Sequence, residues 1–178
     1  MKHNLNLPIK KEDLKTLKLE DIVFLNGTLI TARDQAHKRI LKLNKNNKLP
    51  AELKGLEGSA IYHCGPIIKE CENKYILISG GPTTSERMDT IQNEVVDILG
   101  IKLIIGKGGM KNLNTKDYRV CYLSLTGGCG AIISKKVKKI RSVLWKDLGL
   151  CEAVWFLEVK NFGPLIVTQL NGKSIYEN

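Results

Sequence analysis

The chain has 178 residues, of which 43% are hydrophobic, and a formal net charge of +10 at pH 7. This length suits a single domain with a buried core. No apolar run approaches the roughly 18 residues that a membrane span needs, and the polar, lysine-rich N-terminus lacks the apolar centre of a signal peptide. We therefore expect a cytoplasmic protein in which residues 1–18 form a polar segment and residues 19–178 form the domain.

The basic charge would attract phosphates, but most of it comes from lysines spread along the chain. No nucleic-acid-binding motif and no interleaving of aromatic and basic residues accompanies these lysines. Nucleic-acid binding is therefore the minor alternative. Arginine occurs at only five positions, so an arginine inside a glycine-rich or polar turn is the more informative cation.

The first half of the chain predicts strands that run into turns and helices. Residues 21–31 are rich in β-branched and aromatic residues, as strands are. Residues 32–44 change to helical spacing, with Thr31 as a candidate N-cap. The short runs "SAIYHCG" and "KYILISG" predict two further strands.

The second half repeats this alternation. Residues 85–99 carry an apolar stripe at helical spacing, with Thr84 as a candidate N-cap and Gly100 as the C-cap. "IKLIIG", "RVCYLSL", "AVWFLEV" and "LIVTQL" predict strands, and "CGAIISKKVKKI" predicts a helix. Asn171-Gly172 is a hairpin signal. The element order indicates a mixed α/β fold.

Three of the predicted strand-end turns carry a cation: Arg33 in "TARDQAH", Arg87 in "GGPTTSER" and Lys107 in "GKGGM". Ligands of open α/β folds gather at the carboxyl ends of strands, and three cations from three such ends would suit a small di- or trianion. The alternative for each cation is a solvated surface charge. "GKGGM" lacks the spacing of a phosphate-binding P-loop.

The threonine pair in "GGPTTSER" also has two interpretations. A threonine before a helix is usually a cap. Its hydroxyl becomes a base only where the alkoxide is stabilised, and Arg87 and Lys107 are groups that could stabilise it.

The five cysteines predict neither a disulfide framework nor a metal site, because their number is odd and none forms a Cys-x-x-Cys pair. Cys64, Cys121 and Cys151 lie in apolar stretches, and we expect them to pack as small hydrophobic residues.

Four motifs, "GTLITARDQAHKR", "GPTTSERMD", "IGKGGM" and "GGCGAI", follow one another in an order that resembles one family. The family is the β subunit of the iron–sulfur hydro-lyases, which comprise two-subunit class I fumarate hydratases and L(+)-tartrate dehydratases. Its β subunit corresponds to the C-terminal domain of single-chain class I fumarases. The resemblance extends from about Leu19 to the C-terminus, and "GPTTSERMD" is its most specific motif. Ala32 departs from the glycine typical of single-chain fumarases but leaves Arg33 in place.

The resemblance implies a swivelling β/β/α domain and a [4Fe–4S] cluster bound by three cysteines of a partner α subunit, whose open iron acts as a Lewis acid on the substrate. It implies Thr83 as the base that takes a proton from the carbon beside a carboxylate. Arg33, Arg87 and Lys107 would bind the carboxylates, and Asp34 and His37 would support or orient them. His63 is interpreted as structural.

We therefore expect an obligatory α partner, an α2β2 assembly and little activity of this chain alone. The expected reaction is hydration of fumarate to malate, preferred as the commoner metabolic need, or alternatively dehydration of L(+)-tartrate. A non-catalytic basic module that binds nucleic acid or an acidic protein is the alternative from another functional class.

Overall fold

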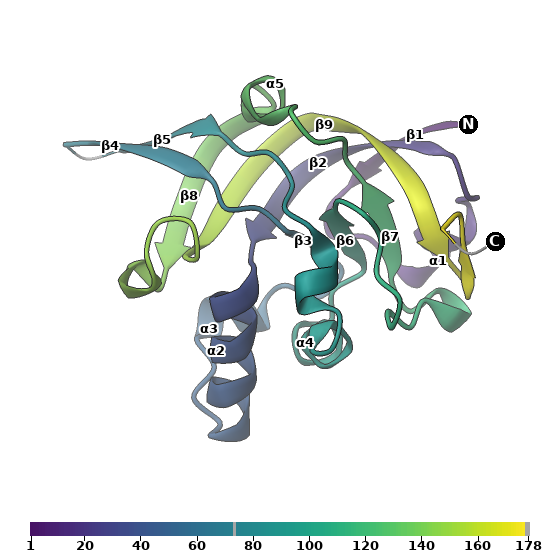
Figure 1. The fold of residues 1–178 in the computed structure, drawn as a ribbon, viewed down its shortest axis with the longest axis horizontal. Helices are drawn as coiled ribbons and strands as arrows, with labels where there is room; N and C mark the ends of the chain where they lie inside the picture. The colour runs from purple at the N-terminus through teal and green to yellow at the C-terminus, as the bar shows by residue number, and fades with distance from the viewer. Residues whose placement is uncertain (73, 177–178) are drawn as a thin grey trace.

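The computed structural model describes residues 1–72 and 74–176, and these form a mixed α/β fold (Figure 1). This confirms the predicted fold class. In chain order the elements are β1 (Lys2–Asn6), α1 (Lys11–Lys15), β2 (Ile22–Thr31), α2 (Asp34–Lys45), α3 (Ala51–Lys54), β3 (Ala60–Tyr62), β4 (Ile67–Cys71), β5 (Lys74–Ser79), the 3-10 helix η1 (Ser85–Met88), α4 (Gln92–Leu99), β6 (Leu103–Gly106), the 3-10 helix η2 (Lys116–Tyr118), β7 (Cys121–Ser124), α5 (Gly130–Ser134), β8 (Val137–Leu144), the 3-10 helix η3 (Lys146–Leu148), β9 (Val154–Leu170) and β10 (Lys173–Ser174).

The main sheet closes on itself. Strands β2, β3, β6 and β7 pair side by side in parallel, and β9 pairs antiparallel with both β7 and β2. Strand β9 can reach both partners because it is 17 residues long and curves across the molecule (Figure 1). Its first half also carries β8, and β4 and β5 form a separate two-stranded sheet.

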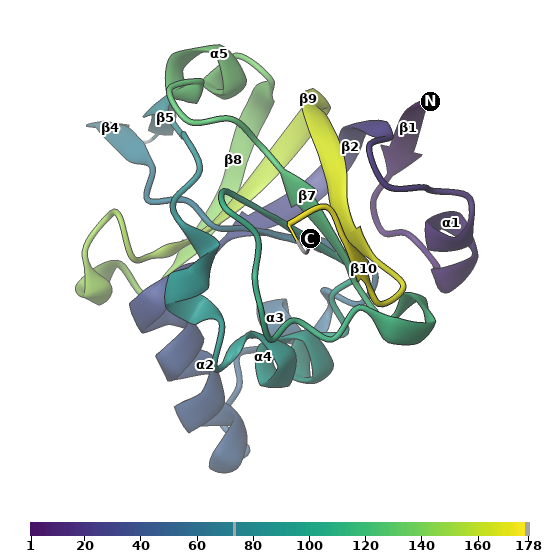
Figure 2. The ribbon, with the colours of Figure 1, turned by 45° about the vertical axis from the view of Figure 1, so that its right-hand side comes forward.

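Alternating side chains of this sheet feed two separate cores, because successive residues of a strand point to opposite faces. Leu29 and Tyr62 belong to the core enclosed by the strands, whereas their neighbours Ile30 and Ile61 belong to the second core. The second core is completed by residues of α2, α3 and α4, such as Ile40. These helices lie together on one side of the sheet (Figure 2).

Residues 1–18, expected as a polar segment, form β1 and α1. Strand β1 pairs in parallel with β2, and Leu5 and Leu14 are buried in the enclosed core. Apolar residues are few and widely spaced between lysines in residues 1–18. The composition of this segment therefore gives no sign that it contributes to the core. The predicted hairpin at Asn171-Gly172 is confirmed: both residues have positive φ, and β9 pairs antiparallel with β10.

The single helix predicted over residues 85–99 is wrong. The chain forms η1, then a turn, then α4. Asp89 lies in the turn, where its carboxylate accepts hydrogen bonds from the backbone and side-chain nitrogens of Asn112. Because this acceptor holds a distant loop, the tertiary contact overrides the helical pattern.

Neither predicted threonine cap forms a capping bond, although Thr84 does occupy the N-cap position of η1. Thr84 precedes η1 without a side-chain capping bond, and the N-cap of α2 is Arg33. The Thr31 hydroxyl instead accepts the backbone N–H of Trp155 at 3.1 Å, on the neighbouring strand. The helix predicted for "CGAIISKKVKKI" ends at Ser134, and its lysine-rich part begins β8. None of the helices in the described residues combines the length and the hydropathy that a membrane span requires.

Candidate active site at the ends of three parallel strands

Three parallel neighbours, β2, β3 and β6, end at the same edge of the sheet. Arg33 lies two residues beyond the end of β2, His63 directly follows β3, and Lys107 directly follows β6. Because neighbouring parallel strands present their carboxyl ends together, two of the three predicted cation-bearing turns meet here as a direct consequence of strand order.

The Thr83 turn reaches the same edge by a different route. It follows β5, which lies outside the main sheet. Beyond β5 the chain forms isolated bridges from Pro82 to Cys64 and from Thr84 to Lys107. The backbone N–H of Thr83 donates to the His63 carbonyl at 2.8 Å. This segment therefore lies between the ends of β3 and β6, and half-buried Thr83 stands beside the turns of Arg33 and Lys107.

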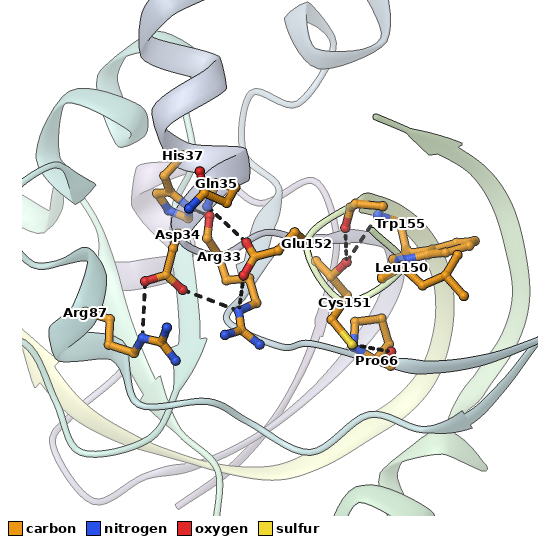
Figure 3. Close-up of polar contacts among 12 residues, drawn as sticks. Arg33, Asp34, Gln35, His37, Pro66, Arg87, Leu150, Cys151, Glu152 and Trp155 are labelled. Carbon is orange, nitrogen blue, oxygen red and sulfur yellow. Dashed lines mark hydrogen bonds and ion pairs between the residues drawn. The ribbon is translucent and has the colours of Figure 1, made fainter. Parts of the chain in front are cut away.

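The two predicted arginines share one carboxylate. Arg87 Nε donates to Asp34 Oδ1 at 3.1 Å, and Arg33 Nε lies 3.4 Å from Asp34 Oδ2 (Figure 3). Burial opposes ionisation of Asp34, but its own backbone N–H and the charges of Arg87 and Arg33 hold the pKa of this carboxyl below its usual value. Asp34, predicted as a supporting residue, thus contacts both guanidinium groups.

A second carboxylate, Glu152, was missed by sequence reasoning. It lies 3.0 Å from Arg33 Nε and accepts the backbone N–H of Gln35 at 2.9 Å (Figure 3). Glu152 precedes β9, whose Phe156 pairs with Ile30 of β2. The antiparallel register therefore brings the start of β9 to the end of β2, and only that pairing, which is not visible in the sequence, could have indicated the contact.

Both arginines keep their terminal nitrogens free of these acids. Asp34 and Glu152 are closest to the guanidinium groups at Nε (Figure 3), and among the described residues no Nη atom of either arginine forms a hydrogen bond. The Arg33 side chain is 18% exposed and that of Arg87 is 50% exposed. A Cβ on Gly65 would overlap Arg33 Nη1, so a larger residue there would displace the end of the arginine side chain from this position. Lys107 is exposed at the same edge.

His37 does not face the exposed part of this site. It is fully buried, and its ring lies between the Arg33 carbonyl, 3.0 Å from Nδ1, and the Gln92 side chain, 2.9 Å from Nε2. His63 is equally buried and reaches the same Gln92 side chain at 2.8 Å. His63 was predicted in a strand-end turn as a structural residue, and it does follow β3 directly. Its contact with Gln92 was not predicted, because a helix residue and a strand-end residue give no local signal of a shared partner.

The donor set for a metal or cluster is lacking in the described part of the chain, where no group of three His, Cys, Asp or Glu residues lies close enough to hold an ion. Burial raises the pKa of the Cys64 thiol to about 12, which keeps it protonated. Cys64 and Cys121 are buried as predicted, whereas Cys151 is exposed at the surface, with its Sγ 3.7 Å from the Pro66 carbonyl.

Comparison with known protein families identifies the family of this chain. A family model described as the fumarase C-terminus matches residues 1–178. The chain belongs to this family.

A Methanocaldococcus jannaschii protein named "Putative L(+)-tartrate dehydratase subunit beta" is 49% identical over 95% of this chain and 88% of its own length. The Escherichia coli K12 protein named "L(+)-tartrate dehydratase subunit beta" is 39% identical over 94% of this chain and 83% of its own length. A Geobacillus stearothermophilus protein named "Putative fumarate hydratase class I" is 33% identical over 98% of this chain, which spans 33% of that longer protein. The relatives of this fumarase-family chain are thus named as hydro-lyases.

Proposed function

We propose that this chain is the β subunit of a two-subunit hydro-lyase that dehydrates a C4 hydroxy-dicarboxylate, with L(+)-tartrate the favoured substrate. The observation that carries the proposal is the convergence of Thr83, Arg33, Arg87 and Lys107 at one edge of the sheet. The relatives at 39–49% identity carry the tartrate dehydratase name. This replaces the preference for fumarate, which rested on metabolic frequency alone and now becomes the alternative.

Charge and geometry support dicarboxylate binding. Three cations stand at the edge against two carboxylates, Asp34 and Glu152, and those acids occupy only the Nε positions of Arg33 and of Arg87. Each guanidinium therefore keeps a pair of Nη donors, the geometry that binds a carboxylate through two parallel hydrogen bonds. Lys107 adds a compact third charge. A substrate with two carboxylates could engage both arginines at once.

Thr83 is the proposed base. Its backbone N–H donates to the His63 carbonyl, which holds the Thr83 backbone at the edge. A threonine hydroxyl loses its proton only where neighbouring charge stabilises the oxyanion. Arg87 follows one turn later, and Lys107 is held beside Thr84 by the bridge between their backbones. These two cations would favour the alkoxide, which would then take the proton from the carbon beside a carboxylate.

The proposal requires a partner. Because the described residues lack a donor set for a [4Fe–4S] cluster, we place the cluster on an α subunit, where it would supply the Lewis acid for the leaving hydroxyl. The half-buried or exposed state of Thr83, Arg87 and Lys107 leaves this edge open on the isolated chain. An α subunit that covers the edge would exclude water and complete the site, and we propose an α2β2 complex in the cytoplasm.

The test is a matched pair of threonine variants. The chain is co-expressed with an α-type subunit, purified anaerobically, and assayed with L(+)-tartrate, fumarate and malate. Thr83→Ala should lower kcat by about 10²- to 10⁴-fold, the usual contribution of a general base. Thr84→Ala removes the same hydroxyl from an exposed neighbour and should leave kcat within about threefold. Equal activity of the two variants would refute the assignment of Thr83, and a wild-type complex inactive on all three acids would refute the proposed function.

A further inference from the structure

A buried polar cluster lies directly beneath the candidate site. It consists of His37, His63, Ser85, Gln92 and Tyr122, all of which are fully buried. The structure places the Gln92 amide oxygen, Oε1, between the two rings, 2.9 Å from His37 Nε2 and 2.8 Å from His63 Nε2. His63 Nδ1 lies 2.8 Å from Ser85 Oγ, which lies 2.8 Å from Tyr122 Oη. Buried polar groups at such distances must alternate donors and acceptors.

The Arg33 carbonyl fixes the proton on His37. A carbonyl only accepts hydrogen bonds, so His37 Nδ1, 3.0 Å away, must carry a hydrogen and donate it. Burial lowers the pKa of His37, and burial together with the neighbouring His37 lowers that of His63 to about 3, so both rings are neutral. The neutral His37 therefore presents a lone pair at Nε2, and the Gln92 atom facing it must be a donor.

The amide nitrogen of Gln92 satisfies both rings at once, because it carries two hydrogens. With the amide oxygen between the rings, two acceptors would face each other at His37. The nitrogen would then be the one buried side-chain atom without a partner in the described residues. The reverse orientation leaves only a carbonyl oxygen unpaired, which costs less than an unpaired N–H group. The amide oxygen and nitrogen are not distinguished by shape, and the reverse assignment, with the nitrogen between the rings, fits the donors and acceptors better.

The same logic extends to Ser85. If His63 accepts at Nε2, its Nδ1 carries the hydrogen and donates to Ser85 Oγ, whose own hydrogen is then directed to Tyr122 Oη. A Cβ on Gly106 would overlap Ser85 Oγ, so the glycine of "IGKGGM" makes room for this hydroxyl. The cluster is then a continuous chain of hydrogen bonds between uncharged groups.

Each candidate turn is attached to a member of this cluster. His37 holds the carbonyl of Arg33, and the carbonyl of His63 accepts the N–H of Thr83 at 2.8 Å. The N–H of Ser85 donates to the carbonyl of Lys107 at 3.0 Å. A displacement at the centre of the cluster would therefore move the three turns relative to one another.

We propose that Gln92 is a positioning residue whose amide nitrogen donates to His37 and His63, fixes both as Nδ1–H tautomers, and so sets the relative positions of Arg33, Thr83 and Lys107. The tautomers depend only on contacts within this chain, whereas the positioning role rests on the proposed function.

The tautomer part is tested by ¹⁵N NMR of the histidine rings in the full chain. The protein has only three histidines, and a His3→Gln variant removes the signals of the third. Both remaining rings should show a protonated Nδ1 and an unprotonated Nε2 at pH 7.5, and His63, whose pKa is lowered to about 3, should keep this state down to pH 5. A protonated Nε2 on either ring would overturn the proposal, whatever the enzymatic activity of the complex proves to be.

The positioning part is tested by Gln92→Glu, which keeps the shape but removes the donor. Its carboxylate can only accept, so at least one ring should gain a proton on Nε2 in the NMR spectrum. In the complex with the α subunit, kcat should fall about tenfold or more with KM changed less than about threefold, because the charges remain but the alignment is lost. Asn93→Asp makes the same change one residue along α4, outside the cluster, and should alter neither the tautomers nor kcat.

A variant that changes the tautomers but leaves kcat unchanged would refute the positioning role. Should Gln92→Glu fail to fold, the wild-type tautomers still decide the hydrogen-bond arrangement, and Gln92→Met, which removes the donor without adding charge, decides the effect on kcat. A wild-type complex inactive on all three acids would refute the positioning role together with the proposed function and leave the tautomer result unaffected.

Discussion

Asp34→Asn is the most direct perturbation of the arginine pair. The substitution keeps the side-chain volume but removes the negative charge that Arg33 and Arg87 share. An amide has one oxygen instead of two and turns its NH2 group toward a cation, so at most one Nε contact survives. We therefore expect the guanidinium groups to lose their fixed orientation while their charges remain at the edge.

The magnitude follows from the two contacts. A hydrogen bond to a charged group contributes about 1.5–3 kcal/mol, but Arg87 is 50% exposed and its contact is weakened by solvent. The contact from Arg33 to Asp34 is long, at 3.4 Å, and Glu152 also holds Arg33. Taken together, the loss of orientation should cost roughly 1–2 kcal/mol in binding, or about 5- to 30-fold in KM.

The assay is steady-state kinetics of the αβ complex with L(+)-tartrate. Asp147→Asn is the matched control, because Asp147 also pairs with an arginine, Arg39, on the exposed surface. The thermal unfolding midpoint is measured as well, to separate an effect on binding from an effect on stability. Asp34 is the first residue of α2, where its interaction with the helix dipole stabilises the fold by about 0.3–1 kcal/mol. An unchanged KM in Asp34→Asn would refute the reasoning that this carboxylate orients the substrate-binding arginines.

Two further predictions concern the buried cluster. In Gly106→Ala the new methyl group would overlap Ser85 Oγ and lie 2.9 Å from Tyr122 Oη, so the free energy of unfolding should fall by about 1–3 kcal/mol in urea titrations. Adding Ser85→Ala should recover part of this loss, and equal losses in the single and double variants would contradict the overlap. Burial lowers the pKa of His63 from 6.5 to about 3, so between these values the unfolded chain binds a proton that the folded chain does not. The free energy of unfolding should therefore fall as pH drops through that window, by at most about 1.4 kcal/mol per pH unit for this residue. His63→Gln should show a smaller slope between pH 7 and pH 5, and an identical slope would contradict a neutral buried ring.

Local patterns in the sequence predict the turns of the site better than the contacts between them. Arg33 and Lys107 follow strands whose apolar runs are evident, and parallel neighbours place their ends together, so their convergence follows from fold class. The Thr83 turn was expected at the end of a strand of the same sheet, but β5 lies outside that sheet. The turn arrives through two isolated bridges, and nothing in the local pattern encodes them.

The residues that sequence reasoning missed have their partners far away in the chain. Glu152 is 119 positions from Arg33 in the sequence and meets it through the register of β9 against β2. His63 and Gln92 are separated by a strand pair and a broken helix. Period and capping rules act over a few residues, whereas these contacts depend on how strands pair and on what a buried donor finds within reach.

The neutral cluster also bears on the charge of the edge above it. Arg33, Arg87 and Lys107 already exceed the two carboxylates there, and an imidazolium on buried His37 would add a fourth positive charge close to Arg33. Its repulsion would be strong because little water reaches the interior to screen it. An amide nitrogen that donates to both rings satisfies the two imidazoles while both stay neutral. The fold can therefore use histidines as rigid supports beneath a cationic edge, and the positive charge stays where an anionic substrate can reach it.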